Sequence, residues 1–216
     1  MVMLYDLNKK GTIIVTSGRS GSHLLGDIVS NELKKKNIAH TNCTEIFLTS
    51  SPIYSVHNFF KTTMQQVDQL TSYKIIQIQD FQSKLWMICH GIKWLSEYHI
   101  IVLQRDDTVN HLCSKLILHN FHHVIPIHTI KNTDSGNFNI LKDNKITITI
   151  DDICQFLAEK ELLARFTADE TVEYNNMCQW SITAESKYLK NNYDIKLSDL
   201  FTNYDDLIKF LEFKNE

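Results

Sequence analysis

Short runs of apolar and β-branched residues alternate, in the first half of the chain, with segments whose apolar positions recur at helical spacing. Each run is too short for a helix and is bounded by glycine or polar residues, which predicts a buried strand. We predict strands over residues 12–16, 38–43, 73–78 and 99–103. Apolar residues three and four positions apart predict helices over about 22–36, 56–71, 81–96 and 108–117.

Four repeats of a strand followed by a helix define the expected fold class. Such repeats favour a mainly parallel sheet with right-handed crossovers and helices on both faces. We therefore expect a three-layer α/β fold, and the family resemblance carried by residues 17–25 implies that it is of the P-loop-like kind. In sheets of this type, ligands bind beyond the carboxyl ends of the strands.

The second half of the chain is more polar and less regular. Residues 130–144 carry a turn signal at Asp134-Ser135-Gly136-Asn137 and are interpreted as a surface insertion. Residues 145–150 alternate like an exposed strand, and helices are expected from about 151 to 166, 170 to 191 and 205 to 213. We expect a single domain over residues 1–216, with a ligand-binding core over 1–125 and the insertion and C-terminal helices over 126–216.

Composition and charge narrow the classes of function. The 216 residues are 43% apolar and 22% charged, which is ordinary for a globular protein with a full core. The net charge of −3 gives no basic excess, so we do not expect nucleic acid as a partner. Five cysteines without a C-x-x-C pair indicate reduced thiols. Without a signal peptide or an apolar run of about 18 residues, we expect a soluble cytoplasmic protein with no transmembrane segment.

The turn between the first predicted strand and the first predicted helix is the strongest chemical signal. Successive backbone N–H groups at such a turn, with the positive end of the helix, form an anion site, and Gly21 permits close approach. Ser20 and Ser22 add hydroxyl groups, and Arg19 adds a planar cation suited to phosphate or sulfate oxygens. The turn lacks the Gly-Lys pair of a Walker A loop, which weakens an ATPase or kinase interpretation.

The segment Ser17-Gly18-Arg19-Ser20-Gly21-Ser22-His23-Leu24-Leu25 resembles the 5′-phosphosulfate loop of sulfotransferases. His23 departs from the pattern because it stands where that family has a second hydroxyl, and a histidine can donate there instead. The resemblance implies that Arg19, Ser20, Gly21, Ser22 and His23 bind the 5′ end of 3′-phosphoadenosine 5′-phosphosulfate.

A second segment is similar to the 3′-phosphate motif of the same family. Arg105 follows the fourth predicted strand, and Ser114 lies nine residues later on the next helix. This spacing looks like that of bacterial glycolipid-type sulfotransferases. The resemblance implies that Arg105 and Ser114 hold the 3′-phosphate of the donor.

Sulfuryl transfer also needs a base for the acceptor hydroxyl and a group that stabilises the leaving phosphate. Glu45, in Cys43-Thr44-Glu45-Ile46-Phe47, resembles the catalytic base of carbohydrate and glycolipid sulfotransferases. Asp80 is the reserve candidate, since no histidine stands after the third strand as in the small-molecule enzymes. Arg19 would act electrostatically on the leaving group. The implied acceptor is a small-molecule or glycan hydroxyl, with a carbohydrate or glycolipid favoured over a phenol.

Two alternatives stay open. One is a phosphoryl transferase with a degenerate phosphate loop, which would need a Mg²⁺-binding carboxylate near Ser22 and a lysine equivalent. The other is a nucleotide-binding module without turnover. We expect no metal, because the histidines at 119, 122, 123 and 128 have no acidic or cysteine partner at ligand spacing.

Overall fold

The computed structural model describes residues 2–18, 20–44, 46–47, 53–121, 143–180 and 197–213. The chain forms two compact units, each made of two stretches. Unit 1 comprises Met1–Asp106 and Glu159–Lys187, and unit 2 comprises Asp107–Ala158 and Tyr188–Glu216. The prediction of one domain over 1–216, divided near residue 125, is not decided by this grouping and stays a prediction.

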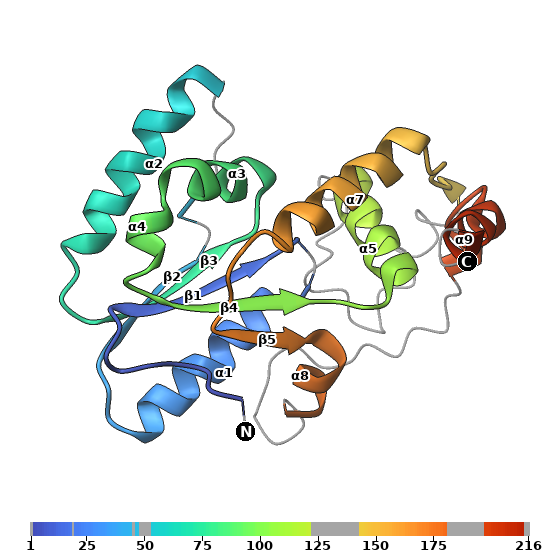
Figure 1. The fold of residues 1–216 in the computed structure, drawn as a ribbon. Helices are drawn as coiled ribbons and strands as arrows, with labels where there is room; N and C mark the ends of the chain where they lie inside the picture. The colour runs from blue at the N-terminus through green and yellow to red at the C-terminus, as the bar shows by residue number, and fades with distance from the viewer. Residues whose placement is uncertain are drawn as a thin grey trace. The chain divides into compact units, whose positions relative to one another are not determined.

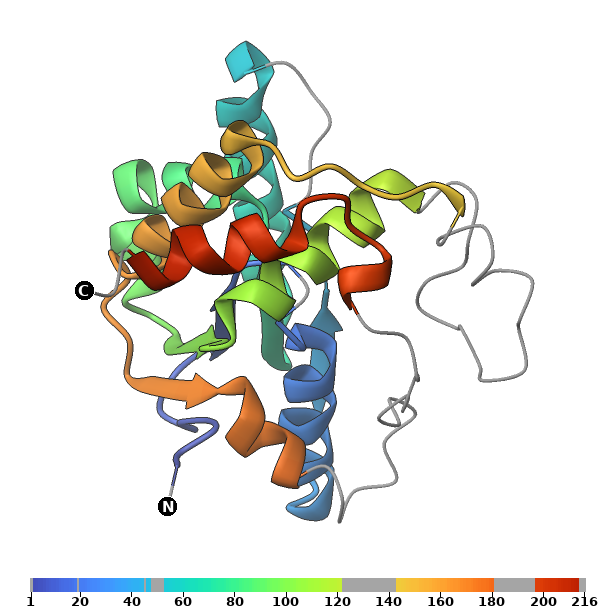
Figure 2. The same cartoon turned by 90° about the vertical axis from the view of Figure 1, so that its right-hand side faces the viewer.

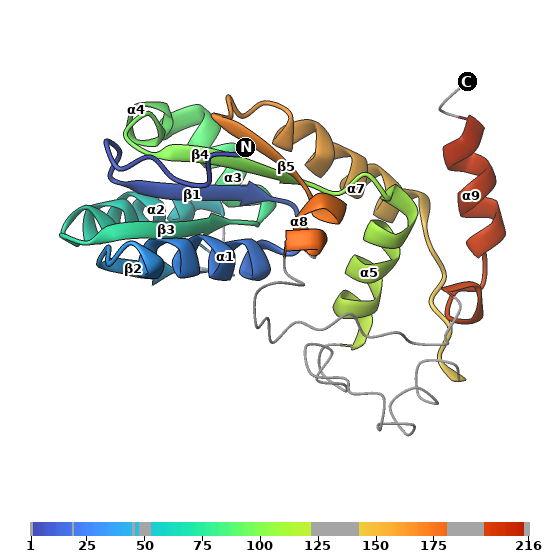
Figure 3. The same cartoon turned by 90° about the horizontal axis from the view of Figure 1, so that it is seen from below.

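Unit 1 is built on a five-stranded parallel sheet. Its strands are β1 (Gly11–Thr16), β2 (His40–Cys43), β3 (Tyr73–Ile78), β4 (His99–Gln104) and β5 (Glu170–Glu173), in the order β2-β3-β1-β4-β5 (Figure 3). The central strand β1 pairs with β3 and with β4, and Thr12 lies opposite Ile75 and His99. The expected α/β class with a parallel sheet is confirmed.

Helices cover both faces of this sheet, which is why β1, β3 and most of β4 are buried along their length. Helix α1 (Ser22–Lys35) and helix α8 (Tyr174–Trp180) lie on one face (Figures 1 and 2). Helices α2 (Ile53–Asp68), α3 (Phe81–His90) and α4 (Ile92–Leu95) lie on the other. Alternate strand residues feed the two cores, so that Ile14 packs under α1 while Ile13 and Val15 pack under α2 and α3.

Two sequence predictions in unit 1 need correction. The helix expected over 81–96 is interrupted at Gly91, whose backbone (φ −101°, ψ 1°) is not helical, so α3 and α4 are separate. The helix expected over 170–191 begins too early, because Glu170–Glu173 form the edge strand β5 and α8 starts at Tyr174. Val172 is the one fully buried residue of β5, so the strand has no apolar run that the sequence could reveal. Residues 181–191 lie outside the described residues.

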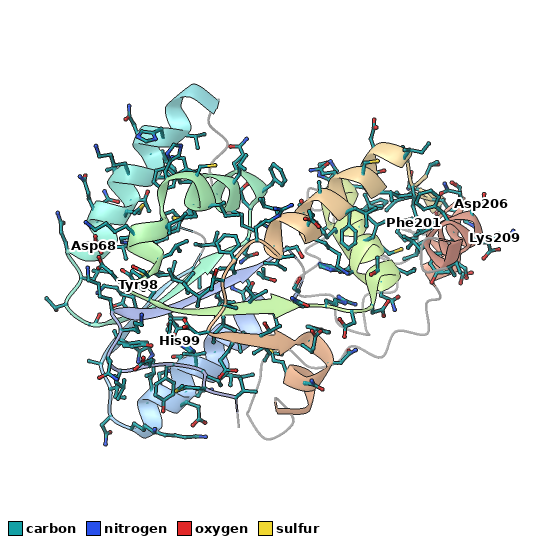
Figure 4. All side chains as sticks on the ribbon, viewed as in Figure 1. Asp68, Tyr98, His99, Phe201, Asp206 and Lys209 are labelled. Atoms are coloured by element: carbon teal, nitrogen blue, oxygen red, sulfur yellow. The ribbon has the colours of Figure 1, made fainter. Side chains whose placement is uncertain are left out.

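The amino-terminal edge of the sheet is tied together by side chains with structural roles. Asp68, at the end of α2, accepts hydrogen bonds from Trp94 Nε1 at 3.0 Å and Tyr98 Oη at 3.4 Å (Figure 4). Burial and the Asp68 carboxylate raise the pKa of Tyr98. His99 Nε2 lies 2.7 Å from the carbonyl of Met3, which fixes the segment before β1.

Unit 2 contains α5 (Thr108–Phe121), the first part of α7 (Ile150–Leu163), the 3₁₀ turn η1 (Leu197–Asp199) and α9 (Tyr204–Phe213). Ile146 pairs with Phe201 in a short parallel bridge, and both side chains are buried. Figure 4 labels the buried Phe201 and, on α9, Asp206 and Lys209. The last two residues are exposed. The exposed strand predicted for 145–150 is wrong: Ile146 makes only the isolated bridge to Phe201, and α7 already begins at Ile150. The alternation appears in burial alone, since Ile146 and Ile148 are buried between exposed neighbours. Residues 130–142 of the predicted insertion lie outside the described residues.

Within the described ranges, no helix is both long enough and apolar enough to cross a membrane.

Candidate functional site: the β1–α1 loop of unit 1

The loop that joins β1 to α1, residues 17–21, leaves the central strand at the carboxyl edge of the sheet. From β1 the chain crosses toward β2, whereas from its neighbour β4 it crosses toward β5 at the opposite end of the sheet. Where neighbouring strands send their connections in opposite directions, a crevice opens at the carboxyl edge, and ligands bind there. Topology therefore places this loop and the segment after β4 at the sheet's preferred binding position.

Internal hydrogen bonds brace the loop. The Ser20 hydroxyl donates to the carbonyl oxygen of Ser17 at 2.6 Å, and the two serine hydroxyls lie 3.4 Å apart. Both side chains are buried. Because the Ser20 proton is committed to Ser17, the structure gives this hydroxyl a role in shaping the loop. Arg19 lies outside the described residues.

The start of α1 has the form of an anion-binding helix terminus. Gly21 precedes the helix in the left-handed conformation (φ 83°), it has no side chain with which to cap the helix, and its carbonyl accepts from Leu25 N at 3.0 Å. The first turn contains no acidic residue that would occupy the positive end. Ser22 is buried and His23 half-buried there. The N–H groups of a first helical turn have no partner within their helix and attract anions.

Gly21 also lets α8 approach the loop. A Cβ at this position would lie 2.8 Å from Met177 Cε and 2.8 Å from Tyr174 Cε2. The space left by the missing side chain of Gly21 is therefore filled by α8. A ligand would have to reach the loop from another direction. Together with the positive φ, this packing explains why glycine is required.

Arg105 follows β4 and is held by the same aromatic side chain. Its guanidinium lies 4.8 Å from the centre of the Tyr174 ring, a cation–π arrangement. Tyr174 thus contacts the loop at Gly21 and positions Arg105 beside it. Each contact is within unit 1.

A carboxyl pair flanks this arginine. Asp106 follows Arg105, and Glu173 precedes Tyr174. Burial, followed by the charge of Asp106 and a hydrogen bond to it, raises the pKa of Glu173, while Lys160 acts in the opposite direction. Two carboxyl groups that share a hydrogen bond retain a proton more readily than isolated ones.

Sequence reasoning missed Lys84, which lies beneath the loop. This side chain on α3 is completely buried, and its ammonium donates to the carbonyl oxygens of Thr16 and Gln79 at 2.9 Å each. Thr16 is the last residue of β1, and Gln79 follows the end of β3. The available signal was a lysine on the same helical face as the buried Ser83 and Met87.

An apolar pocket of about 440 Å³ opens between α2 and α3. Trp86 Nε1 donates to His57 Nδ1 at 3.2 Å, and the rings of Trp86, His57 and His90 pack with centroids 5.3–5.6 Å apart. The described lining residues are Val56, His57, Phe81, Gln82, Leu85, Trp86, Cys89 and His90. None of these eight is an acid, a lysine or an arginine.

The structure gathers five of the predicted site residues, Ser20, Gly21, Ser22, His23 and Arg105, in unit 1. Ser114 lies on α5 in unit 2, and its pairing with Arg105 stays a prediction. Glu45, like Arg19, lies outside the described residues.

The reserve base Asp80 has a structural role, because its carboxylate caps α3 by accepting from Gln82 N at 3.1 Å and Ser83 N at 2.8 Å. Where residues are described, no three His, Cys, Asp or Glu side chains gather to hold a metal ion. Of the histidine cluster, His122, His123 and His128 lie outside those residues.

No family model matches the sequence, and no curated protein compared with it matches either.

Proposed function

We propose that this protein is a sulfotransferase that moves the sulfuryl group of 3′-phosphoadenosine 5′-phosphosulfate to a hydroxyl of a carbohydrate or glycolipid. The observation that carries the proposal is the loop between the central strand and α1, with Arg105 held beside it by Tyr174. An anion at the start of α1 and a second anion at Arg105 match a nucleotide with phosphate at both its 5′ and 3′ positions.

The proposed reaction is an in-line displacement at sulfur. The acceptor oxygen forms a bond to sulfur while the bond from sulfur to the 5′-phosphate oxygen breaks. The acceptor proton goes to Glu45, and adenosine 3′,5′-bisphosphate leaves. Arg19 and the first-turn N–H groups of α1 would stabilise the negative charge that develops on the leaving oxygen. Arg105 and Ser114 would hold the 3′-phosphate away from the reacting atoms.

The pocket between α2 and α3 supports a glycolipid as acceptor. Among the described residues its walls are mostly apolar and aromatic and bear no acid, lysine or arginine, so that they suit a hydrocarbon segment. Trp86 offers a ring on which a sugar can stack. We therefore favour, within the proposed acceptor class, a molecule that joins a glycan hydroxyl to an apolar part.

One observation favours a second candidate, phosphoryl transfer. The Lys84 ammonium lies against the carbonyl of Thr16, just before the loop, although not within a Walker sequence. Asp106 lies two residues beyond the end of β4, and Glu173 is the last residue of β5. A phosphoryl transferase would bind ATP with Mg²⁺ in preference to the bisphosphate. Comparing the two nucleotides separates the candidates.

Turnover by a Glu45→Gln variant tests the proposed reaction. Loss of a general base lowers rates by roughly 10²–10⁴-fold, and nucleotide affinity should not change because a general base acts on the acceptor hydroxyl. Glu32→Gln, which removes an exposed carboxylate paired with Lys35, is the matched control and should retain full activity. The assay follows transfer from the phosphosulfate donor to a panel of glycolipids and free glycans.

Two results would contradict the proposal. Wild-type rates in Glu45→Gln would remove the assigned base. Tight binding of the bisphosphate without turnover on any hydroxyl acceptor would favour the nucleotide-binding module.

A further inference from the structure

Lys84 is a buried cation that the proposed reaction does not yet use. Its exposed fraction is 0%, and it lies on the sheet-facing side of α3 with Ser83 and Met87. Transferring an ammonium group from water to a protein interior is costly unless polar groups replace the lost hydration. Here the carbonyl oxygens of Thr16 and Gln79 replace part of it, each at 2.9 Å.

The two carbonyl groups locate the cation relative to the anion site. Thr16 ends the central strand, and the β1–α1 loop begins at the next residue. Gln79 follows the neighbouring strand β3. The ammonium therefore links the carboxyl ends of two adjacent strands, β1 and β3, at the point where the β1–α1 loop begins. In a protein interior a charge acts over longer distances than in water, because the effective dielectric constant is lower.

We propose that Lys84 is the positioning cation of the anion site. It fixes the carbonyl of Thr16, and with it the start of the loop, and its charge attracts the anionic group bound above. The chain thereby supplies from α3 the positive charge that a Walker loop supplies from its own lysine. The inference rests on the proposed binding of a phosphorylated nucleotide at this loop.

Two variants separate charge from hydrogen bonding. Lys84→Met removes both, whereas Lys84→Gln removes the charge and retains N–H donors. Lys74→Met is the matched control, because Lys74 is also a buried lysine of unit 1 (5% exposed) and lies opposite Gly11 at the other end of β1. Five residue steps along β1 separate the two ends by about 16 Å.

The measurement is calorimetric titration with adenosine 3′,5′-bisphosphate, adenosine 5′-monophosphate, ATP and inorganic pyrophosphate, beside thermal unfolding of each variant. Unit charges about 10 Å apart at an effective dielectric constant near 20 attract enough to change Kd by roughly tenfold. We expect the Kd for the bisphosphate to rise by about tenfold in both Lys84 variants. The rise should be smaller for the monophosphate, because an electrostatic effect scales with ligand charge. Lys74→Met should stay within about twofold of wild type.

The outcomes distinguish this inference from the proposed function. Unchanged affinity in folded Lys84 variants overturns the inference and leaves the proposed function standing. An equal loss in Lys74→Met also overturns it, because position would then be irrelevant. Failure of both Lys84 variants to fold assigns the lysine to the fold and overturns the inference as well. Absence of binding of every probe to the wild type overturns both.

Discussion

Gly21→Ala perturbs the point where the β1–α1 loop, α1 and α8 meet. Alanine would have to adopt the left-handed backbone conformation that Gly21 holds at φ 83°. Left-handed backbone costs a residue with a Cβ roughly 1–2 kcal/mol. The new methyl group would also lie 2.8 Å from both Met177 Cε and Tyr174 Cε2. Overpacking of this kind typically costs about 1–3 kcal/mol. We therefore expect the free energy of unfolding to fall by about 2–5 kcal/mol.

Gly18→Ala is the matched control in the same loop. Among the described residues other than its chain neighbours, no heavy atom lies within 4 Å of the position a Cβ would take at Gly18, and Gly18 does not adopt a positive φ. Gly18→Ala should change the free energy of unfolding by no more than about 1 kcal/mol. Any change should be stabilising, because alanine lowers the conformational entropy of the unfolded chain.

Urea denaturation followed by tryptophan fluorescence measures both variants. A second arm combines Gly21→Ala with Met177→Ala, which removes one of the two clashing side chains. The double variant should lose less stability than the sum of the single losses, because the clash with Met177 is relieved while the clash with Tyr174 and the backbone strain persist. Equal stability of Gly21→Ala and Gly18→Ala, or strict additivity in the double variant, would refute the close packing of α8 on Gly21.

Three further predictions concern other parts of the chain. Burial, followed by the charge of Asp106 and a hydrogen bond to it, raises the pKa of Glu173. The folded state therefore binds the Glu173 carboxyl proton more tightly than the unfolded chain does, and the stability that this proton contributes is lost as pH rises. Glu173→Gln should therefore stabilise the protein by about 0.5 kcal/mol at pH 8 and by less at pH 5, as measured by urea titration; equal effects at both would argue against the carboxyl pair. Burial, with Asp107 as a smaller cause, raises the pKa of the Cys113 thiol to about 12, so a thiol reagent at pH 8 should label exposed Cys89 in the native protein and Cys113 only after unfolding, which mass spectrometry of labelled peptides can verify. Phe201 is 2% exposed in the core of unit 2, so Phe201→Ala should lower the free energy of unfolding by about 3–5 kcal/mol. A loss below about 1 kcal/mol in thermal unfolding would contradict the packing of Phe201.

The sequence predicted the central strands well, for a physical reason. Buried parallel strands such as β1, β3 and β4 are apolar over consecutive residues, and helices that cover them have one apolar face. Strand β5 escaped prediction because an edge strand with one buried residue carries no comparable pattern. Its pairing with β4 is a tertiary contact, which local sequence does not encode.

The candidate site was predictable only in part. The position of Ser20 and Gly21 after a buried strand indicated the loop, because strand, turn and helix are consecutive in the chain. Tyr174 and Lys84 reach the loop from segments distant in sequence, and neither belongs to a recognisable motif. The roles of Arg19, Glu45 and Ser114 stay predictions that rest on resemblance.

Calorimetric titration with adenosine 3′,5′-bisphosphate, run beside ATP with Mg²⁺, tests the central claim most directly. The variants are Arg19→Ala and Arg105→Ala, with Arg165→Ala as control because Arg165 is exposed and paired with Glu161 at 2.8 Å. Charge-assisted hydrogen bonds are worth roughly 1.5–3 kcal/mol each, so each of the first two variants should weaken binding by at least tenfold, whereas the control should bind as the wild type does. Micromolar binding of the bisphosphate with these losses is the predicted result. No binding, or a preference for ATP with Mg²⁺, would contradict the account.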